Sequence, residues 1–557
     1  MSRVAISKIG DNLKEAILNC FEPFGTIRNF IPSSSEGKIF LKINGVHYTP
    51  FSYTDPDLIN GLIELFRNIC SNDIFIIENC TSGNFTRLVL HIAGITEVIK
   101  KWNSKGVHLI YMDEEPPCTV KLGKDQYEVE IPQIIHDELI KNRLKNVYIS
   151  LPKLKAHWST KITLGIKLQL GFLYDQSKAI RHDIYHKQRL VDILELIYPD
   201  FCLVDGKVGV ARGPTPPARI IDEYIHTYGI LFGGTDVVAV DAIGGKLLGF
   251  KNLEVETTKI AHERKLGCGD INQIEIVGNE NLDAYIKQIP YLFKYEFPKE
   301  VKLVEGADKI CFDGCQGLTL VALETLYLEL GIEKSFSIIY GAGFKKQDLE
   351  NLKEPILLIG PCAVEDIGTY LRSKYQNIIE VNTCGTLGAY IDAIMETFGV
   401  NPFAFVPINP VESMLLYLMA KTKGLKALLP SIPSLDVIIQ TITGQTKQIP
   451  DSLIQDPEFI EVLEILSMND DVKIRSTLAP LVCELLIKRN FHASVKILLR
   501  SLDDSSEKVV LATLKAMRPL SESSVSRSDP LFEKLKELKL SKDPKLLRII
   551  EKNFPFL

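Results

Sequence analysis

Residues 151–167 bring four lysines and one histidine together in a protein of net acidic charge. They lie on a predicted strand end and the helix after it, and they are Lys153, Lys155, His157, Lys161 and Lys167. Such a cluster can bind phosphate, a carboxylate or another anion, with each lysine acting as a point charge. For any single lysine, a solvated basic face is the alternative. Pro152 and Trp158 indicate a constrained loop, which favours Lys155 and His157 as a functional pair.

An acidic partner for this pair is Asp205, which follows a predicted strand beginning at Phe201. Open α/β sheets bind ligands at the carboxyl ends of their strands. We therefore predict that Lys155, His157 and Asp205 form a catalytic group in a shared cleft. The alternatives are that His157 is a metal ligand, a general base or a structural residue, and that Asp205 is a turn residue. Asp236, which follows two glycines, could equally be a helix N-cap.

Four of the eleven cysteines fall in one segment, each at or just after the end of a predicted strand: Cys311, Cys315, Cys362 and Cys384. Right-handed βα units place the carboxyl ends of parallel strands on one edge, so we expect these thiols to converge. Four converging thiols suit zinc or an iron–sulfur cluster. The spacing matches neither a ferredoxin run nor a paired zinc ribbon. The alternative is that they are small apolar residues of an α/β core.

The elements that must position these residues differ along the chain. Residues 1–300 alternate strand-like and helix-like stretches, which predicts an α/β domain with a mixed or parallel sheet. Residues 301–410 contain four βα repeats, with strands at 309–311, 335–341, 355–360 and 377–382, which predicts a small flavodoxin-like parallel sheet. Residues 411–454 are expected to be a connector.

Residues 455–557 have no convincing strand and predict an all-helical domain. Two stretches that begin at Asp470 and Leu502 are similar, since each has an acidic turn followed by apolar residues at helical spacing. They resemble HEAT-type helical repeats, in which stacked helix pairs share one core. We expect one continuous core and an extended surface that docks a partner protein. The core is predicted to contain Val472, Ile474, Leu478, Leu481, Val495, Leu498, Leu499 and Leu502.

The composition excludes several classes of protein. The chain has 557 residues, 64 Lys and Arg against 70 Asp and Glu, and a net charge of −6, which argues against a general nucleic-acid-binding protein. The first residues lack an apolar signal core, and no uncharged stretch is long enough to span a bilayer. An odd, sparse set of cysteines is not a disulfide scaffold. We therefore expect a cytoplasmic protein with no membrane segment.

Four stretches of the first 300 residues resemble one known family. The run LPKLKAHWSTKITLGIK at 151–167 is similar to its signature, and the others are Lys42-Ile-Asn44, Asp205-Gly206 with Gly213-Pro214, and Gly233–Asp241. The family is domain-of-unknown-function family 362. The resemblance adds Lys42 and Asn44 to the anion-binding candidates. It departs at Ile43, where the family has Pro, and at Leu168, where it usually has Asn.

The family's activity is largely undefined, but relatives often carry cluster-binding cysteines. This resemblance favours an iron–sulfur cluster, such as 4Fe–4S, over zinc. Our leading hypothesis is a cytoplasmic iron–sulfur protein with a redox or cofactor-handling role. It would bind an anionic small molecule in the first domain. If it is an enzyme, this hypothesis predicts an iron–sulfur-dependent oxidoreductase. The alternatives are a zinc-binding scaffold or metallochaperone without catalysis, and a metal-dependent isomerase or hydrolase that uses His157 and Asp205.

Overall fold

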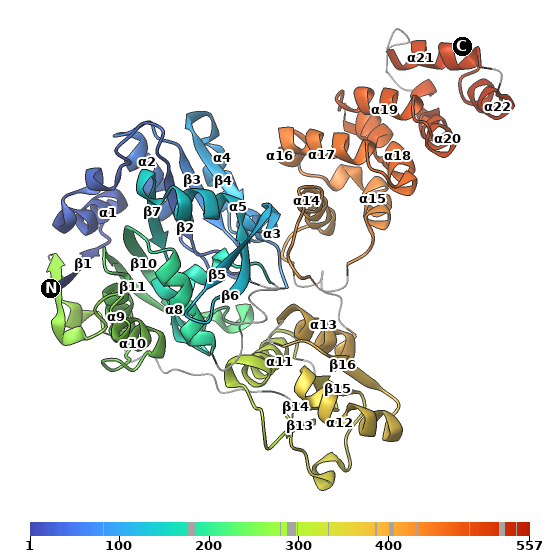
Figure 1. Ribbon diagram of the computed structural model, residues 1–557. Coiled ribbons are helices and arrows are strands. Elements are labelled where there is room, and N and C mark those ends of the chain that lie inside the picture. The colour runs from blue at the N-terminus through green and yellow to red at the C-terminus, as the bar shows by residue number, and fades with distance from the viewer. Residues whose placement is uncertain are drawn as a thin grey trace. The chain divides into compact units, whose positions relative to one another are not determined.

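The computed structural model forms two compact units. One unit contains residues 1–402 and 426–430, and the other contains residues 403–425 and 431–557. The structure describes the chain except for residues 82, 176–184, 279, 287–296, 298, 332–333, 385–386, 400–405, 430–431, 490, 523–529 and 542. Within the described residues, no helix has the length and apolar character needed to cross a membrane. The protein is α/β, with helices in both units, and among the described residues the sheets belong to the first unit (Figure 1).

The first unit contains a large mixed sheet that joins ten strands of the described chain. Its order is β12 (Ile274–Gly278), β1 (Ser2–Lys8), β11 (Ile225–Gly234), β10 (Phe201–Val210), β7 (Val147–Leu151), β2 (Ile39–Ile43), β3 (Ile74–Glu78) and β4 (Val107–Tyr111), with β8 (Lys153–His157) beside β10 and β9 (Lys161–Thr163) beside β8. From β10 to β4 the neighbouring strands are parallel, so their carboxyl ends share one edge.

Helices cover both faces of this sheet, as Figure 1 shows. One core joins the strands to α1 (Leu13–Phe21), α2 (Pro56–Arg67), α3 (Thr86–Ile92) and α4 (Ile95–Lys100). Another core joins them to α8 (His186–Leu196), α9 (Val237–Leu247) and α10 (Glu256–Glu263). Central strands buried on both faces explain the near-continuous apolar runs of the sequence.

The second sheet of the first unit contains β13 (Val301–Glu305), β14 (Phe336–Tyr340), β15 (Ile356–Ile359) and β16 (Ile378–Val381). All neighbours are parallel, as expected, and they lie in chain order, without the reversal of strand order found in flavodoxin. The helices are α11 (Gly317–Leu330), α12 (Pro361–Lys374) and α13 (Leu387–Phe398). The strand predicted at 309–311 is wrong. The alternating apolar and polar residues of β13 supply this strand instead.

The second unit is a two-layer stack of helix pairs. One layer contains α14 (Pro410–Thr422), α17 (Pro457–Ser467), α19 (Ser494–Leu502) and α21 (Pro530–Lys539), and the other contains α15 (Leu435–Thr443), α18 (Val472–Arg489), α20 (Glu507–Ala516) and α22 (Pro544–Asn553). Each helix packs on the next of its own layer. The expected connector, residues 411–454, therefore contains most of the first pair. The described part of residues 455–557 has no strand.

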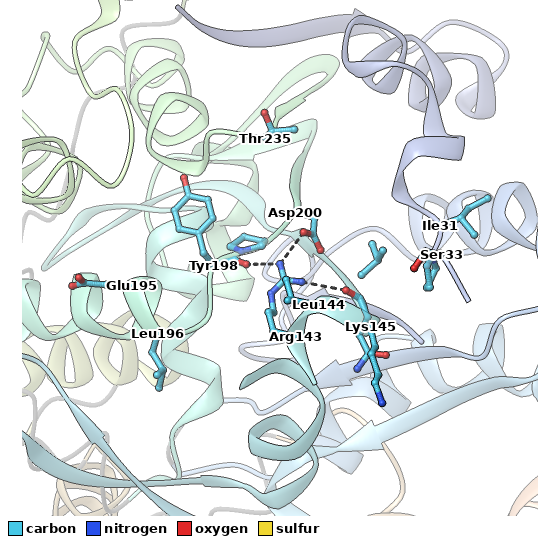
Figure 2. A pocket seen from close by; sticks show the side chains of 14 residues that line it. Ile31, Ser33, Arg143, Leu144, Lys145, Glu195, Leu196, Tyr198, Asp200 and Thr235 are labelled. Atoms are coloured by element: carbon cyan, nitrogen blue, oxygen red, sulfur yellow. Dashed lines mark hydrogen bonds and ion pairs between the residues drawn. The ribbon is translucent and has the colours of Figure 1, made fainter. Parts of the chain in front are cut away.

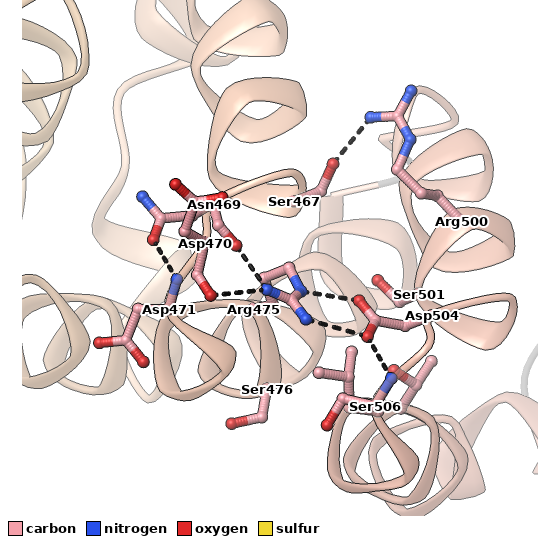
Figure 3. A network of polar contacts seen from close by, with 12 residues as sticks. Ser467, Asn469, Asp470, Asp471, Arg475, Ser476, Arg500, Ser501, Asp504 and Ser506 are labelled. Carbon is pink, nitrogen blue, oxygen red and sulfur yellow. Dashed lines mark hydrogen bonds and ion pairs between the residues drawn. The ribbon is translucent and has the colours of Figure 1, made fainter.

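The two similar acidic stretches of this unit contact each other through one arginine. The guanidinium of Arg475 donates to both carboxylate oxygens of Asp504, at 2.7 and 3.1 Å, and to the carbonyls of Asn469 and Asp470 (Figure 3). Asp504 also accepts a hydrogen bond from the backbone of Ser506. The recurring acidic turn thus joins successive helix pairs, which explains its repetition in the sequence.

The predicted core of the helical domain is only partly buried. The buried members are Leu478, Leu481, Leu498 and Leu502. The half-buried members are Val472, Ile474, Val495 and Leu499. The helical spacing therefore identified the correct face of α18 and α19, with some of its residues at the margin of the core.

Candidate functional site

The carboxyl edge of the large sheet contains a buried ion pair. Lys42, near the end of β2, has no exposed surface, and its Nζ lies 2.8 Å from Oε1 of Glu78, the last residue of β3. Glu78 also accepts hydrogen bonds from the backbone N–H groups of Gly45 and Asn79. Lys42 is thus at the predicted edge, with its charge balanced by a carboxylate that the sequence analysis did not identify.

Two polar atoms of the loop after β2 are buried and accept or donate no hydrogen bond within the described residues. They are Oδ1 of Asn44 and Oγ of Ser52. The backbone of Asn44 is satisfied, since its N–H donates to Oγ1 of Thr54 and its carbonyl accepts from Thr54. Buried polar groups are normally hydrogen-bonded, so two unsatisfied ones on a loop that these Asn44–Thr54 bonds close point to a ligand or water position.

Strand β8 places Lys153, Lys155 and His157 on one face, because side chains along a strand alternate. All five residues of β8 are buried. The Nζ of Lys153 lies 2.9 Å from Oδ2 of Asp205, and the sheet pairs these two residues directly. Asp205 also accepts hydrogen bonds from the backbone N–H groups of Asp55 and Lys207.

Lys155 differs from the other buried lysines of this edge. Its Nζ donates to the backbone carbonyls of Ser52 at 2.8 Å and Pro214 at 3.4 Å, and within the described residues these are its hydrogen-bond partners. Burial lowers the pKa of Lys155 well below its usual value, the charges of Lys167 and Lys153 lower it further, and Glu78 opposes them. An ammonium with no ion-pair partner in the described chain favours its neutral amine form.

His47 and Tyr48 lie half-buried on the loop after β2. Burial, together with the positive charge of Lys155, lowers the pKa of His47 to about 4. Burial and the charge of Glu329 raise the pKa of Tyr48 to about 12. The imidazole is therefore neutral at physiological pH, and the phenol is protonated.

His157 has a different environment from the one we predicted. Its Nδ1 accepts hydrogen bonds from the backbone N–H groups of Ser159 at 3.1 Å and Thr160 at 3.4 Å, which places the proton of the neutral ring on Nε2. The hydrogen bonds of Asp205 do not involve His157 or Lys155. The catalytic group predicted from the sequence is thus divided between a Lys153–Asp205 pair, an isolated Lys155 and a His157 that orders a turn.

The two outer lysines of the cluster have smaller roles. Lys161 is half-buried, has a positive φ of 65°, and pairs with Glu254 at 2.8 Å. Lys167 lies half-buried in the short helix α6 (Gly165–Leu168), near enough for its charge to lower the pKa of Lys155. Asp241, in α9, accepts hydrogen bonds from the backbone N–H groups at the start of α6. Asp236 caps α9 by accepting from Ala239.

The cysteines lie at the corresponding edge of the second sheet. Cys311 follows β13 and precedes the turn Phe312–Gln316 (η11), and its carbonyl accepts from the backbone of Gly314 and Gln316. This curled loop buries Cys315, and burial raises the pKa of its thiol, with charges at Cys311 and Cys362 acting in the same direction. Cys311 and Cys362 are therefore near enough to Cys315 for their charges to act on its thiol.

The fourth cysteine, Cys384, is exposed and follows β16. Among the described residues, no group of three or more His, Cys, Asp or Glu side chains is arranged to hold a metal ion. The donor chemistry suits a soft metal, but the side chains are not in coordination geometry.

The cysteine loop contacts the turn that follows Lys155 and His157. Trp158 lies edge-to-face with Phe312, and a Cβ at Gly317 would lie 2.2 Å from Cζ3 of Trp158. Oγ of Ser159 donates to Oδ1 of Asp313 at 2.6 Å. The Nζ of Lys187 lies 3.0 Å from the same carboxylate. The loop of the predicted cysteine site therefore contacts the turn beside the predicted anion site, although the two lie far apart in sequence.

The opposite, amino edge of the large sheet has an open pocket of about 650 Å³ (Figure 2). It is lined by residues that precede β7 and β10. Arg143 lies in it, paired with Asp200 at 2.8 Å and donating to the carbonyls of Tyr198 and Asn146. The charge of Arg143 is satisfied by Asp200 and by two backbone carbonyls, so this pocket provides less support for a site than the carboxyl edge does.

A comparison with family models bears on this arrangement. Residues 39–246 match the model of a domain of unknown function (DUF362). This segment is a DUF362 domain. The match confirms the resemblance inferred from the sequence, and it includes Lys42, Asn44, Lys155, His157 and Asp205. The four cysteines and the helical unit lie outside it. No curated protein and no solved structure is significantly similar to the chain.

Sequence reasoning missed three members of the carboxyl edge, Glu78, Ser52 and His47. A signal existed for Glu78, since it is the one charged residue in the otherwise apolar run Ile74–Glu78. Ser52 and His47 lie on a loop with no motif, so only the folded chain brings them to Lys155.

Proposed function

We propose that the DUF362 domain binds a small anionic molecule at the carboxyl edge of its sheet, and that Lys155 acts on this molecule. The observation that carries the proposal is the hydrogen bonding of Lys155, a wholly buried amine bonded to two carbonyls beside two unsatisfied polar atoms. A protein gains no stability from such an arrangement, because an unpaired buried charge is costly. Function is the simplest reason to maintain it.

The chemistry available to Lys155 follows from its environment. A lysine whose pKa is lowered by burial can accept a proton from a ligand when it is in its neutral amine form, as a general base does. The charge of Lys167 attracts an anionic ligand toward the same position. The other two buried lysines are held in ion pairs, so we assign them to positioning the strands rather than to the ligand.

For the cysteines, we propose a redox or cofactor-handling role. Cys311, Cys315 and Cys362, with Cys384 as a fourth ligand, would hold an iron–sulfur cluster, and zinc is the alternative. The mutual influence of the first three thiols favours this proposal. When bound, a cluster would supply one-electron transfer. Because the described side chains are not in coordination geometry, we derive no step through it.

The rival function, a metal-dependent isomerase or hydrolase using His157 and Asp205, has less support. Asp205 is paired with Lys153, and Nδ1 of His157 bonds two backbone N–H groups. For the helical unit we propose HEAT-type repeats that dock a partner protein, with a cytoplasmic location for the whole chain.

Ligand binding tests the first proposal. Calorimetry with phosphate, succinate and pyruvate would compare the wild type with Lys155→Met and with a matched control, Lys161→Met, in which the lost lysine is half-exposed. We expect at least one anion to bind, Lys155→Met to lose about tenfold or more in affinity, equivalent to about 1.4 kcal/mol, and the control to remain near wild type. Equal binding by all three proteins would contradict the role of Lys155.

Metal analysis tests the second proposal. Protein purified without oxygen is expected to contain iron and sulfide, with absorption near about 400 nm, and Cys362→Ser is expected to lose them. Stoichiometric zinc in a colourless protein would support the scaffold alternative. A protein without metal, or a Cys362→Ser variant with full metal content, would overturn the cysteine site.

A further inference from the structure

We infer that the ligand of the carboxyl edge is an anionic carbonyl compound of the 2-oxo acid class, and that Nζ of Lys155 forms an imine with its carbonyl carbon. This inference rests on the proposed anion site and adds the reacting group and the bond. It concerns one atom, the Nζ of a side chain with no exposed surface.

The first support is the hydrogen bonding of the amine. Both partners of Nζ are backbone carbonyls, Ser52 O at 2.8 Å and Pro214 O at 3.4 Å, so the bonds use its hydrogens and leave the nitrogen lone pair of the neutral amine available. These carbonyls belong to separate loops, which hold the nitrogen from two sides. Lysines that form Schiff bases in enzymes are desolvated or lie next to another cation, and Lys155 satisfies both conditions.

The second support is the pair of unsatisfied atoms. The hydroxyl of Ser52 belongs to the residue whose carbonyl holds Nζ, and it can donate to an oxygen that forms on the attacked carbon. Oδ1 of Asn44 can accept from the hydroxyl that this oxygen becomes in the carbinolamine. The carbinolamine of a 2-oxo acid would therefore offer a hydrogen-bond partner to both groups, and its carboxylate would bring negative charge toward Lys167.

The same edge contains two lysines that fail these conditions, which makes the inference specific. Lys42 bonds the carboxylate of Glu78 and Lys153 bonds that of Asp205, at 2.8 and 2.9 Å. A carboxylate partner stabilises the ammonium form, which has no lone pair for attack. The inference therefore predicts reaction at Lys155 and none at its neighbour on β8.

The step balances without an oxidant or a reductant. The Nζ lone pair attacks the carbonyl carbon, the C–N bond forms, and the carbonyl π electrons move to oxygen to give a carbinolamine after proton transfer from nitrogen. The carbinolamine hydroxyl takes one proton from a water molecule, which is left as hydroxide. The C–O bond then breaks, and the hydroxyl leaves as water. The product is an iminium ion, which draws electrons from the adjacent carbon and would make its proton removable.

Reductive trapping on the full-length protein tests the inference. The protein is incubated with pyruvate or glyoxylate and then with borohydride, which converts an iminium to a stable secondary amine. Intact mass and peptide mapping then locate the adduct. We expect one adduct per chain with pyruvate, equal in mass to pyruvate less one oxygen atom, on Lys155. Lactate, which has the carboxylate but no carbonyl, should give none, and Lys161→Met should trap as the wild type does.

The outcomes separate the two proposals. Pyruvate or glyoxylate that binds by calorimetry but leaves Lys155 unmodified after borohydride would overturn the imine and leave the anion site standing. Adducts spread over exposed lysines, with Lys155 unmodified, would also overturn it. If none of phosphate, succinate, pyruvate or glyoxylate binds and no adduct forms, both proposals fail. Mapping on the wild-type chain keeps the test valid even if Lys155→Met does not fold.

Discussion

The two edges of the large sheet use charge in opposite ways. At the amino edge, Arg143 lies in an open pocket, bonded to Asp200 and to two carbonyls, and both side chains of the pair are partly exposed. At the carboxyl edge, three lysines are wholly buried or nearly so, and one of them, Lys155, has only carbonyl partners in the described chain. The open pocket is electrostatically satisfied, whereas the closed edge is not.

This difference shows that buried polar groups without hydrogen-bond partners indicate a functional site better than the volume of an open pocket does. A surface pocket forms wherever loops meet, and solvent screens its charges. A buried amine has to be maintained against its desolvation cost, so its presence indicates a use. Variants at each edge test whether the two edges differ in this way. Both tryptophans, Trp102 and Trp158, belong to the first unit, so their fluorescence reports its unfolding alone.

The largest effect is expected for Glu78→Gln at the carboxyl edge. It removes the carboxylate from the buried Lys42 ammonium, and breaking a buried pair costs about 3–5 kcal/mol. We expect the fluorescence transition at a lower denaturant concentration, with a free energy of unfolding lower by about 3–5 kcal/mol. If Glu78→Gln lowers the free energy of unfolding no more than an amino-edge variant does, the two edges do not differ.

The second variant is Asp113→Asn. Asp113 has another buried carboxyl group and lies just after β4. Burial raises the pKa of Asp113 from 3.8 to about 7, with the charge of Glu114 acting in the same direction, and its Oδ1 has no hydrogen-bond partner in the described chain. The folded protein therefore keeps a proton that the unfolded chain releases, and stability is lost as pH rises from 3.8 to about 7.

Asparagine avoids this loss, so Asp113→Asn should be more stable than the wild type by on the order of 2–4 kcal/mol at about pH 8. The gain should shrink progressively as pH falls toward about 4. Thermal unfolding across this range measures it. Asp241→Asn is the control, because both oxygens of Asp241 accept backbone hydrogen bonds and the amide can keep only one. An equal gain in the control would refute the explanation.

The third variant, Lys155→Met, should stabilise the fold by about 1–3 kcal/mol while it removes ligand binding, since apolar replacement of an uncompensated buried charge is often stabilising. The lowered pKa sets the sign of the pH dependence. The unfolded chain binds the proton more tightly, so wild-type stability increases as pH rises toward the ordinary lysine range, and the advantage of methionine is largest at lower pH. A destabilised variant would indicate that Lys155 is structural.

The smallest effect is expected for Arg143→Gln at the amino edge. Its side chain is 27% exposed and that of Asp200 is 35% exposed, and pairs of this kind contribute about 1 kcal/mol or less. The same fluorescence assay measures it. A loss comparable to that of Glu78→Gln would remove the distinction between the edges.

Much of the fold was predictable because its signals are local. The apolar runs of β2, β3 and β7, the helical spacing of α2 and the strand–helix transition from β11 to α9 all follow from short stretches. The first strand of the second sheet was predicted at 309–311, whereas the chain forms it at Val301–Glu305, where Lys302 interrupts the apolar residues. The helices in 411–454 were missed because prolines and threonines interrupt their pattern.

The candidate site was only half predictable. The sequence Lys-Leu-Lys-Ala-His alternates charged and apolar residues, as in a strand with one face in solvent, yet all five residues are buried. Sequence alone identified Lys155 from its type and neighbours. Its partners come from a loop about a hundred positions away and from a turn after β10, and only the folded sheet brings them together.

Within the described chain, Lys155 is a buried amine without a charge partner. Measuring its titration is a direct test of this assignment. Lysine carrying ¹³C at Cε and ¹⁵N at Nζ reports protonation by nuclear magnetic resonance, and the signal missing from Lys155→Met identifies the residue. We predict a transition well below the ordinary lysine value of about 10.4. A Lys155 signal that titrates at that value or above it would contradict the account.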